Sequence, residues 1–151
     1  DKHRGQKRKD ARGTPYINHP IDVVNLMASI GGITDIEILQ AGMLHDTVED
    51  TDTSPEEIEG RFGYAVRSLV MEVTDDKKLK KQDRKRIQIE KAPHLSPRAK
   101  IIKLADKTAN LTDMIVSPPA DWSLKRRQQY LAWSNPPTGR RHVPRPWPQG
   151  A

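Results

Sequence analysis

Apolar residues recur at helical spacing through most of the chain, and no segment alternates apolar and polar residues as a half-buried strand would. Pro20 suits the first position of a helix, where its missing N–H has no cost. After it, apolar residues recur on one side of the segment, and Gly31-Gly32 is expected to end it. These residues are Ile21, Val24, Leu26 or Met27, and Ile30. The first predicted element is therefore an amphipathic helix.

Two capping boxes mark the starts of the next helices. Thr34 is expected to cap a helix that runs to His45, with Glu37 reaching back to the cap. Ser54 caps a second helix, which stops near Gly63. Further helices are expected over residues 64–73, 84–92, 97–117 and 121–133. The pattern predicts an all-α fold with about six or seven helices and short connections.

The last 18 residues differ in composition from the rest of the chain. They contain five prolines and almost no aliphatic side chain, so they cannot bury enough apolar surface to offset the entropy lost on ordering. We expect one domain over residues 1–133 and a proline-rich, irregular tail over residues 134–151, disordered or lying on the surface. The stretch from Pro144 to Pro148 has an alternative interpretation as a PxxP-type peptide ligand for a partner domain.

Composition excludes several classes of protein. The chain contains no run of 18 apolar residues, so we expect no membrane span. The absence of cysteine excludes disulfides and favours a cytoplasmic location. The net charge is +6, but only 5% of residues are aromatic and no nucleic-acid-binding motif is present, so we expect no nucleic-acid partner. The basic stretch over residues 77–86 is interpreted as a solubilising surface. No sequence feature specifies an oligomeric state.

Polar residues occur where a helical core would be apolar. His45 and Asp46 follow the apolar run AGML, and Asp106 lies within the apolar helix IIKLADKTANL. A buried aspartate is unfavourable unless a partner offsets its charge. Asn110 and Asp113 follow Asp106 at i+4 and i+7, so these three residues share one helix face.

A histidine at the start of another helix, His19, completes a mixed nitrogen and oxygen ligand set. Two histidines and two aspartates from three helices suit Mn²⁺, Fe²⁺ or Zn²⁺. Each residue also has a simpler interpretation: His45 as a satisfied core histidine, Asp46 as a surface residue, and Asp106 as the partner of a nearby lysine. The remaining histidines are expected at the surface: His3, His94 and His142.

Five segments together resemble one family of enzymes. They are GTPYINHPIDV, AGMLHDTVEDT, TSPEEIEGRFG, LVMEVTDDKKL and AKIIKLADKTANLTD. They resemble the HD metal-dependent phosphohydrolases, and more specifically the hydrolase domain of the RelA/SpoT group with its stand-alone metazoan SpoT-type members. The resemblance extends from about Lys2 to Trp133. It departs from the family at both ends: the family usually begins with a helix that ends near KHRGQ, and it continues with further helices where this chain is rich in proline.

The resemblance implies roles for particular residues. The family's metal ligands, usually around Mn²⁺, fall on His19, His45, Asp46 and Asp106. The acidic pair that works on the attacking water falls on Glu49 and Asp50. The positions that contact the nucleotide or line its pocket fall on Arg8, Lys9, Asn110, Arg126 and Tyr130.

The resemblance also implies a reaction. The expected activity is Mn²⁺-dependent removal of the 3′-pyrophosphate of guanosine tetra- or pentaphosphate, giving GDP or GTP and pyrophosphate. Related proteins suggest a second substrate, the 2′-phosphate of NADPH, and one basic pocket could serve both anionic nucleotides. The alternative from another class is an inactive HD-fold remnant that binds a nucleotide or a partner, with an altered C-terminus.

Overall fold

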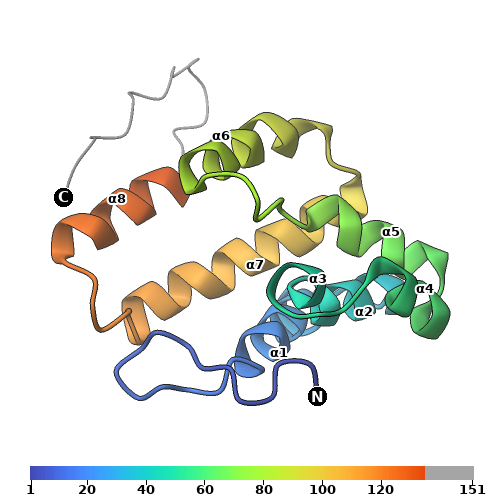
Figure 1. Ribbon diagram of the computed structural model, residues 1–151, viewed down its shortest axis with the longest axis horizontal. Helices are drawn as coiled ribbons and strands as arrows, with labels where there is room; N and C mark the ends of the chain where they lie inside the picture. Colours follow the sequence, from blue (N-terminus) through green and yellow to red (C-terminus); the bar gives the residue numbers. More distant parts are fainter. Residues whose placement is uncertain (135–151) are drawn as a thin grey trace.

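The computed structural model describes residues 1–134, which form an all-α domain (Figure 1). The α-helices are α1 (Asn18–Asn25), α2 (Ile36–Leu44), α3 (Thr47–Asp50), α4 (Pro55–Phe62), α5 (Tyr64–Val73), α6 (Lys81–Lys91), α7 (Pro97–Val116) and α8 (Leu124–Ser134). A π-helical turn, η1 (Leu26–Ile30), extends α1, and a 3₁₀ turn, η2 (Ala92–His94), follows α6. Because α3 is a single turn, seven longer helices remain, and the predicted fold class is confirmed. The predicted proline-rich tail lies, from residue 135 onward, outside the described residues.

The longest helix, α7, lies at the centre of the domain (Figure 1). It packs against α1, α2 and α5, and α8 contacts it as well. It buries mainly small side chains at helical spacing: Ala99, Ile102, Ala105 and Ala109. Small residues let neighbouring helices approach closely, which brings the starts of α1 and α3 next to the polar face of α7.

A glycine on α2 fixes how closely that helix approaches η1. A Cβ atom added at Gly42 would lie 2.2 Å from Cε of Met27, which is 2% exposed and belongs to the core. The absence of a side chain at Gly42 therefore makes room for Met27. This contact joins the end of α2, where His45 follows, to η1, the continuation of α1.

Two helix starts differ from the prediction. Asp35, not Thr34, caps α2: its Oδ1 accepts hydrogen bonds from the amides of Glu37 at 3.0 Å and Ile38 at 3.2 Å. A carboxylate accepts several amides at once, so it competes well for the cap position. Pro20 is the third residue of α1 rather than the first, where its missing N–H is still free of an intrahelical bond.

The other predicted cap is confirmed, since Ser54 accepts a hydrogen bond from the Glu57 amide at 3.2 Å.

None of the helices in residues 1–134 combines the length and the apolar character that a membrane crossing requires.

Candidate metal centre and adjoining cavity

Three separate parts of the fold bring four ionisable side chains together. One ligand atom from each of His19, His45 and Asp106 lies within 4.8 Å of the others. His19 Nε2 is 3.1 Å from Asp106 Oδ1, and Asp46 Oδ2 is 3.1 Å from His45 Nε2. The four residues come from α1, from the junction between α2 and α3, and from the polar face of α7. The residues that the sequence pattern indicated as a ligand set are therefore adjacent in space.

The junction between α2 and α3 orients His45. His45 directly follows the last residue of α2, and its Nδ1 lies 2.8 Å from the carbonyl oxygen of Gly42. A carbonyl only accepts hydrogen bonds, so Nδ1 carries a proton and donates it. Nε2 is then the atom that faces Asp46 and Asp106. Thr47 supports the bend by donating from Oγ1 to the Leu44 carbonyl at 2.7 Å.

The electrostatics of the cluster favour a positive charge at its centre. Burial of Asp106 would raise its pKa, but the hydrogen bonds and charges of His19 and His45 outweigh burial and hold that pKa far below its usual range. Burial likewise opposes the charged form of His45, yet Asp106 and Asp46 raise its pKa to about 10. Two largely buried carboxylates thus face two imidazoles that are 2% and 3% exposed.

The donor atoms fit a divalent metal ion. Within the described residues, His45 Nε2 is buried without a well-aligned hydrogen bond, although it faces the carboxylates of Asp46 and Asp106. Buried polar atoms are rarely left without a partner, so such an atom indicates a missing ligand. Two imidazole nitrogens with two carboxylate oxygens suit first-row divalent ions. The alternative pairing of Asp106 with a lysine is not what the structure shows, because Asp106 contacts His19, His45 and Asn110.

The two acids on α3 are held by residues from the loop and helix that follow α5. Glu49 accepts a hydrogen bond from the Asp75 amide at 3.3 Å and lies 3.6 Å from Arg84. Burial, and then the negative charge of Asp75, raise the pKa of Glu49. Asp50 forms an ion pair with Lys77. Both acids are partly buried on the same turn, one turn beyond the candidate ligands.

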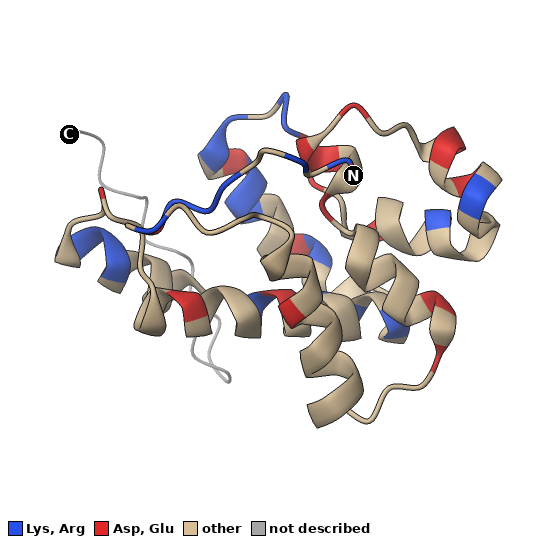
Figure 2. Ribbon diagram, turned by 90° about the horizontal axis from the view of Figure 1, so that it is seen from below, with Lys and Arg blue, Asp and Glu red and all other residues tan. Residues whose placement is uncertain are grey.

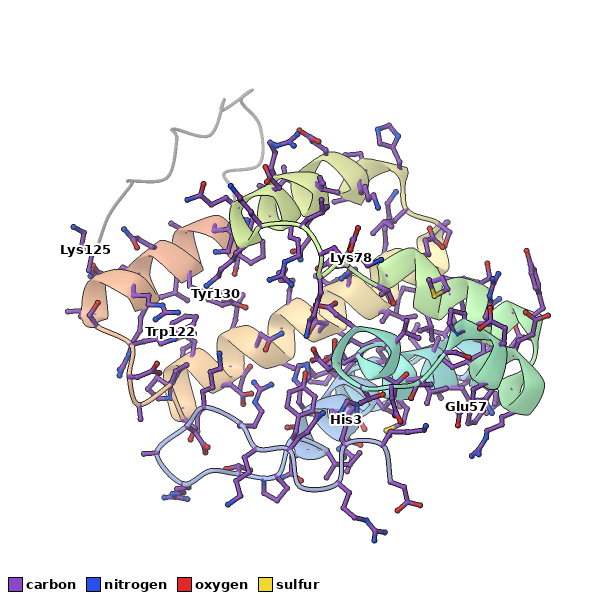
Figure 3. The ribbon with its side chains drawn as sticks, viewed as in Figure 1. His3, Glu57, Lys78, Trp122, Lys125 and Tyr130 are labelled. Carbon is purple, nitrogen blue, oxygen red and sulfur yellow. The ribbon has the colours of Figure 1, made fainter. Side chains whose placement is uncertain are left out.

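A cavity of about 290 Å³ adjoins the four-residue cluster. Figure 2 shows basic residues along the N-terminal segment, and Lys7, Arg8 and Lys9 from this segment line the cavity. Opposite them, Trp122 from the loop before α8 and Tyr130 from α8 itself extend on the side that faces α7 (Figure 3). The remaining lining residues are Asp10, Tyr16, Asn110, Asp113, Met114, Ser117 and Pro119. The cavity therefore combines positive charge with aromatic surface.

The structure brings the five predicted nucleotide contacts to this cavity or beside it. Arg8, Lys9, Asn110 and Tyr130 line it, and Arg126 stacks its Cζ 4.3 Å from the ring centroid of Trp122.

Asn110 connects the cavity with the candidate metal centre. Its Nδ2 donates to Asp106 Oδ1 at 2.6 Å, and its Oδ1 lies 3.3 Å from Arg8. Arg8 also forms an ion pair with Asp113. The polar face predicted for α7 is thus occupied by one continuous network.

Other residues of the site carried no clear sequence signal. Tyr16 donates from Oη to Asp46 at 2.5 Å although it lies in a loop before α1. Lys77 and Arg84 belong to the stretch interpreted as a solubilising surface. Lys77 is exposed but also pairs with Asp50, and Arg84 is half-buried beside Glu49. His3, expected at the surface, is 6% exposed and lies 2.8 Å from Gln6 through Nδ1. His94 is exposed, and His142 lies outside the described part of the chain.

A family model, related sequences and a solved structure all place the chain in the same family. The family model described as "HD domain" matches residues 1–132. The guanosine-3′,5′-bis(diphosphate) 3′-pyrophosphohydrolases MESH1 of Homo sapiens and Drosophila melanogaster are 59% and 54% identical over 133 residues, which cover 88% of this chain and 74% of each relative. A solved structure described as "A metazoan ortholog of SpoT hydrolyzes ppGpp and plays a role in starvation responses" superposes with a TM-score of 0.87 at 54% identity, covering 89% of this chain and 75% of that one. The chain therefore belongs to the HD-domain family.

Proposed function

We propose that this protein is a divalent-metal-dependent hydrolase that removes the 3′-pyrophosphate of guanosine tetra- or pentaphosphate. The observation that carries the proposal is the His19, His45 and Asp106 cluster, with Asp46 beside it, next to a cavity lined by basic residues. The family of the chain and the activities in the names of its relatives support it. The products would be GDP or GTP and pyrophosphate.

The metal would be held by two imidazoles and two carboxylates, from His19, His45, Asp46 and Asp106. A divalent cation bound there supplies a Lewis acid that lowers the pKa of water and offsets the charge of phosphoryl oxygens. We propose Mn²⁺ on the basis of the family resemblance. The same donors also accept Fe²⁺ and Zn²⁺.

Glu49 and Asp50 are proposed to act on the attacking water. The oxygen of that water attacks the phosphorus next to the ribose 3′ oxygen, and the bond between these two substrate atoms breaks. A carboxylate takes a proton from the water, and the leaving 3′ oxygen takes up a proton from solvent to become the ribose hydroxyl. Burial, and then the negative charge of Asp75, raise the pKa of Glu49, which favours Glu49 as the proton acceptor. Lys77 fixes the Asp50 carboxylate, so we assign Asp50 to orienting the water.

The cavity residues are proposed to bind the nucleotide. Arg8 and Lys9 offer charged donors to phosphates and base, and Asn110 offers an amide to the sugar. Tyr130 and Arg126 complete the wall around Trp122. Because basic residues line the cavity, it also suits the 2′-phosphate of NADPH, and we propose NADPH as a second substrate.

The direct test is product release by the purified chain. Pyrophosphate release from guanosine tetraphosphate and phosphate release from NADPH are measured with Mn²⁺ and after treatment with a chelator. We expect Mn²⁺-dependent release, and the ratio of the two rates ranks the substrates. A chain that is helical by circular dichroism, binds Mn²⁺ and releases neither product would reject the proposal. That result would favour the inactive binding remnant, which binds a nucleotide without turnover.

Three expectations about the setting of the protein stay predictions. They are a cytoplasmic location, the absence of a nucleic-acid partner, and a domain boundary after residue 133. Salt-sensitive binding to duplex DNA would contradict the second of these.

A further inference from the structure

Tyr16 connects two carboxylates to which we assign different roles. Its Oη donates a hydrogen bond to Asp46 Oδ2 at 2.5 Å and lies 3.3 Å from Asp50 Oδ2. The first is a candidate metal ligand and the second a candidate orienter of water. Tyr16 therefore lies between the two halves of the proposed chemistry.

The surroundings of Tyr16 hold its ring in place. The ring centroid is 5.0 Å from that of His3 and 5.9 Å from that of His19, and the Arg8 guanidinium carbon lies 5.7 Å from it. Aromatic contacts at these separations favour fixed relative orientations. Because the ring is packed on several sides, the direction of its hydroxyl is set by the fold.

Asp46 needs an external partner to fix its orientation. It occupies the cap position of α3, yet its side chain makes no cap hydrogen bond to that helix. The oxygen that Tyr16 contacts, Oδ2, is also the oxygen 3.1 Å from His45 Nε2 and 3.7 Å from His19 Nε2. A donor on this carboxylate therefore decides how Oδ2 is presented to the two imidazoles.

We infer that Tyr16 is a positioning residue that orients the Asp46 carboxylate for the metal ion and couples it to Asp50. The inference rests on the proposed metal-dependent function. The Tyr16 phenol has one O–H proton and faces two carboxylates, Asp46 and Asp50, so it donates a hydrogen bond to one of them at a time. Partners of this kind orient the ligands of metal sites, and their removal typically weakens metal affinity about 10- to 100-fold.

The test compares two Tyr→Phe variants, each of which removes one phenol hydroxyl, at Tyr16 and at Tyr64. Tyr16→Phe keeps the packed ring and loses the hydrogen bond to Asp46, whereas Tyr64→Phe changes a side chain that is 66% exposed on α5. Mn²⁺ is titrated calorimetrically into each chelator-treated chain, at a temperature where circular dichroism shows it helical. We expect Tyr16→Phe to bind Mn²⁺ about 10- to 100-fold more weakly and Tyr64→Phe to match the wild type.

A second readout detects ligand orientation directly. The visible absorption of bound Co²⁺ depends on coordination geometry, so its bands should shift in Tyr16→Phe and stay unchanged in Tyr64→Phe. A double-mutant cycle with Asp46→Asn then asks whether Tyr16 acts through Asp46. We expect the two affinity losses to be strongly non-additive.

The outcomes separate this inference from the proposed reaction. Mn²⁺ affinity of Tyr16→Phe within twofold of the wild type, or additive losses in the cycle, would overturn the positioning role. A wild-type chain that binds Mn²⁺ but leaves guanosine tetraphosphate intact would reject the proposed reaction and leave the positioning role standing. A wild-type chain that binds no divalent cation would reject both.

Discussion

His19 and Asp106 lie 87 residues apart in the sequence, and their side chains meet at 3.1 Å between Nε2 and Oδ1. The contact joins the first turn of α1 to the middle of α7. Each residue lies on a different helix of the central packing, so the separation of the two atoms is set by the hydrophobic core rather than by a loop. Sites built on packed helices hold their ligands more precisely than sites built on loops.

The first prediction concerns this carboxylate. Asp106→Asn keeps the shape of the side chain but removes the negative charge that both imidazoles face. We expect loss of Mn²⁺ binding and a fall in turnover of more than about 100-fold, beyond the range for a residue that only supports a ligand. Calorimetric Mn²⁺ titration and pyrophosphate release measure the two effects.

The matched control for Asp106→Asn is Asp22→Asn, which makes the same change at an exposed position of α1. It should retain wild-type affinity and turnover. Wild-type turnover in Asp106→Asn would show that the site is assigned wrongly.

The second prediction concerns removal of the metal ion. A ligand that binds only the folded state stabilises it by mass action, so Mn²⁺ at 100 times its dissociation constant should add about 2.7 kcal/mol to the free energy of unfolding. For a chain of this size that corresponds to an increase in melting temperature of roughly 5–10 °C. Mg²⁺ should stabilise less, because it prefers oxygen ligands and the site offers two nitrogens. Equal shifts for both ions would argue against direct coordination by His19 and His45.

Much of the fold follows from local sequence signals. Ser54 and Ser96 each precede a proline and cap a helix through a side-chain oxygen, and the cap at Ser54 was predicted from its capping box. The cap of α2 could not be assigned in the same way, because Thr34 and Asp35 are both good caps. Asp35 also forms an ion pair with Arg98, a tertiary contact that no local pattern contains.

Sequence reasoning identified residues that stand out within apolar helices, and it missed residues whose role depends on a tertiary contact. Asp106 is unusual within an apolar helix and attracts attention for that reason. Lys77 is one of several lysines in a polar stretch, and only the path of the loop brings it to Asp50. Tyr16 likewise reaches Asp46 through the course of the N-terminal segment, which helical periodicity does not describe.

The third prediction concerns the arginine that links the cavity to α7. One terminal nitrogen of Arg8 contacts both Asp113 and Asn110, and the guanidinium also faces the Tyr16 ring. Lysine keeps the charge but not the planar fork, so Arg8→Lys should raise the KM for guanosine tetraphosphate about 10-fold, or about 1.4 kcal/mol. Mn²⁺ affinity should stay at the wild-type value.

Arg4→Lys provides the control for Arg8→Lys, since Arg4 is 83% exposed and pairs with Asp1. A change in Mn²⁺ affinity in Arg8→Lys, with the KM unaltered, would place Arg8 in the support of the metal centre instead of the nucleotide cavity.

The last prediction concerns the pH dependence of stability, through Lys85 on α6. Burial, followed by the positive charges of Lys81, Lys107 and Arg126, lowers the pKa of Lys85 from 10.5 to about 8. The unfolded chain therefore holds this proton more tightly than the folded one, so the charge destabilises the fold below pH 8. This destabilisation fades as the pH rises from about 8 to 10.5.

Lys85→Met keeps the apolar stem and removes the charge, so it should raise the melting temperature at pH 7 and lose that advantage by pH 10.5. An opposing effect is the attraction between the Lys85 ammonium and the Trp133 ring, whose centroid lies 4.2 Å away. Lys91→Met, at an exposed position of the same helix, should show little change at either pH. A lower melting temperature for Lys85→Met at pH 7 would mean that the ring contact outweighs burial and repulsion, so that Lys85 stabilises the packing of α6 against α8.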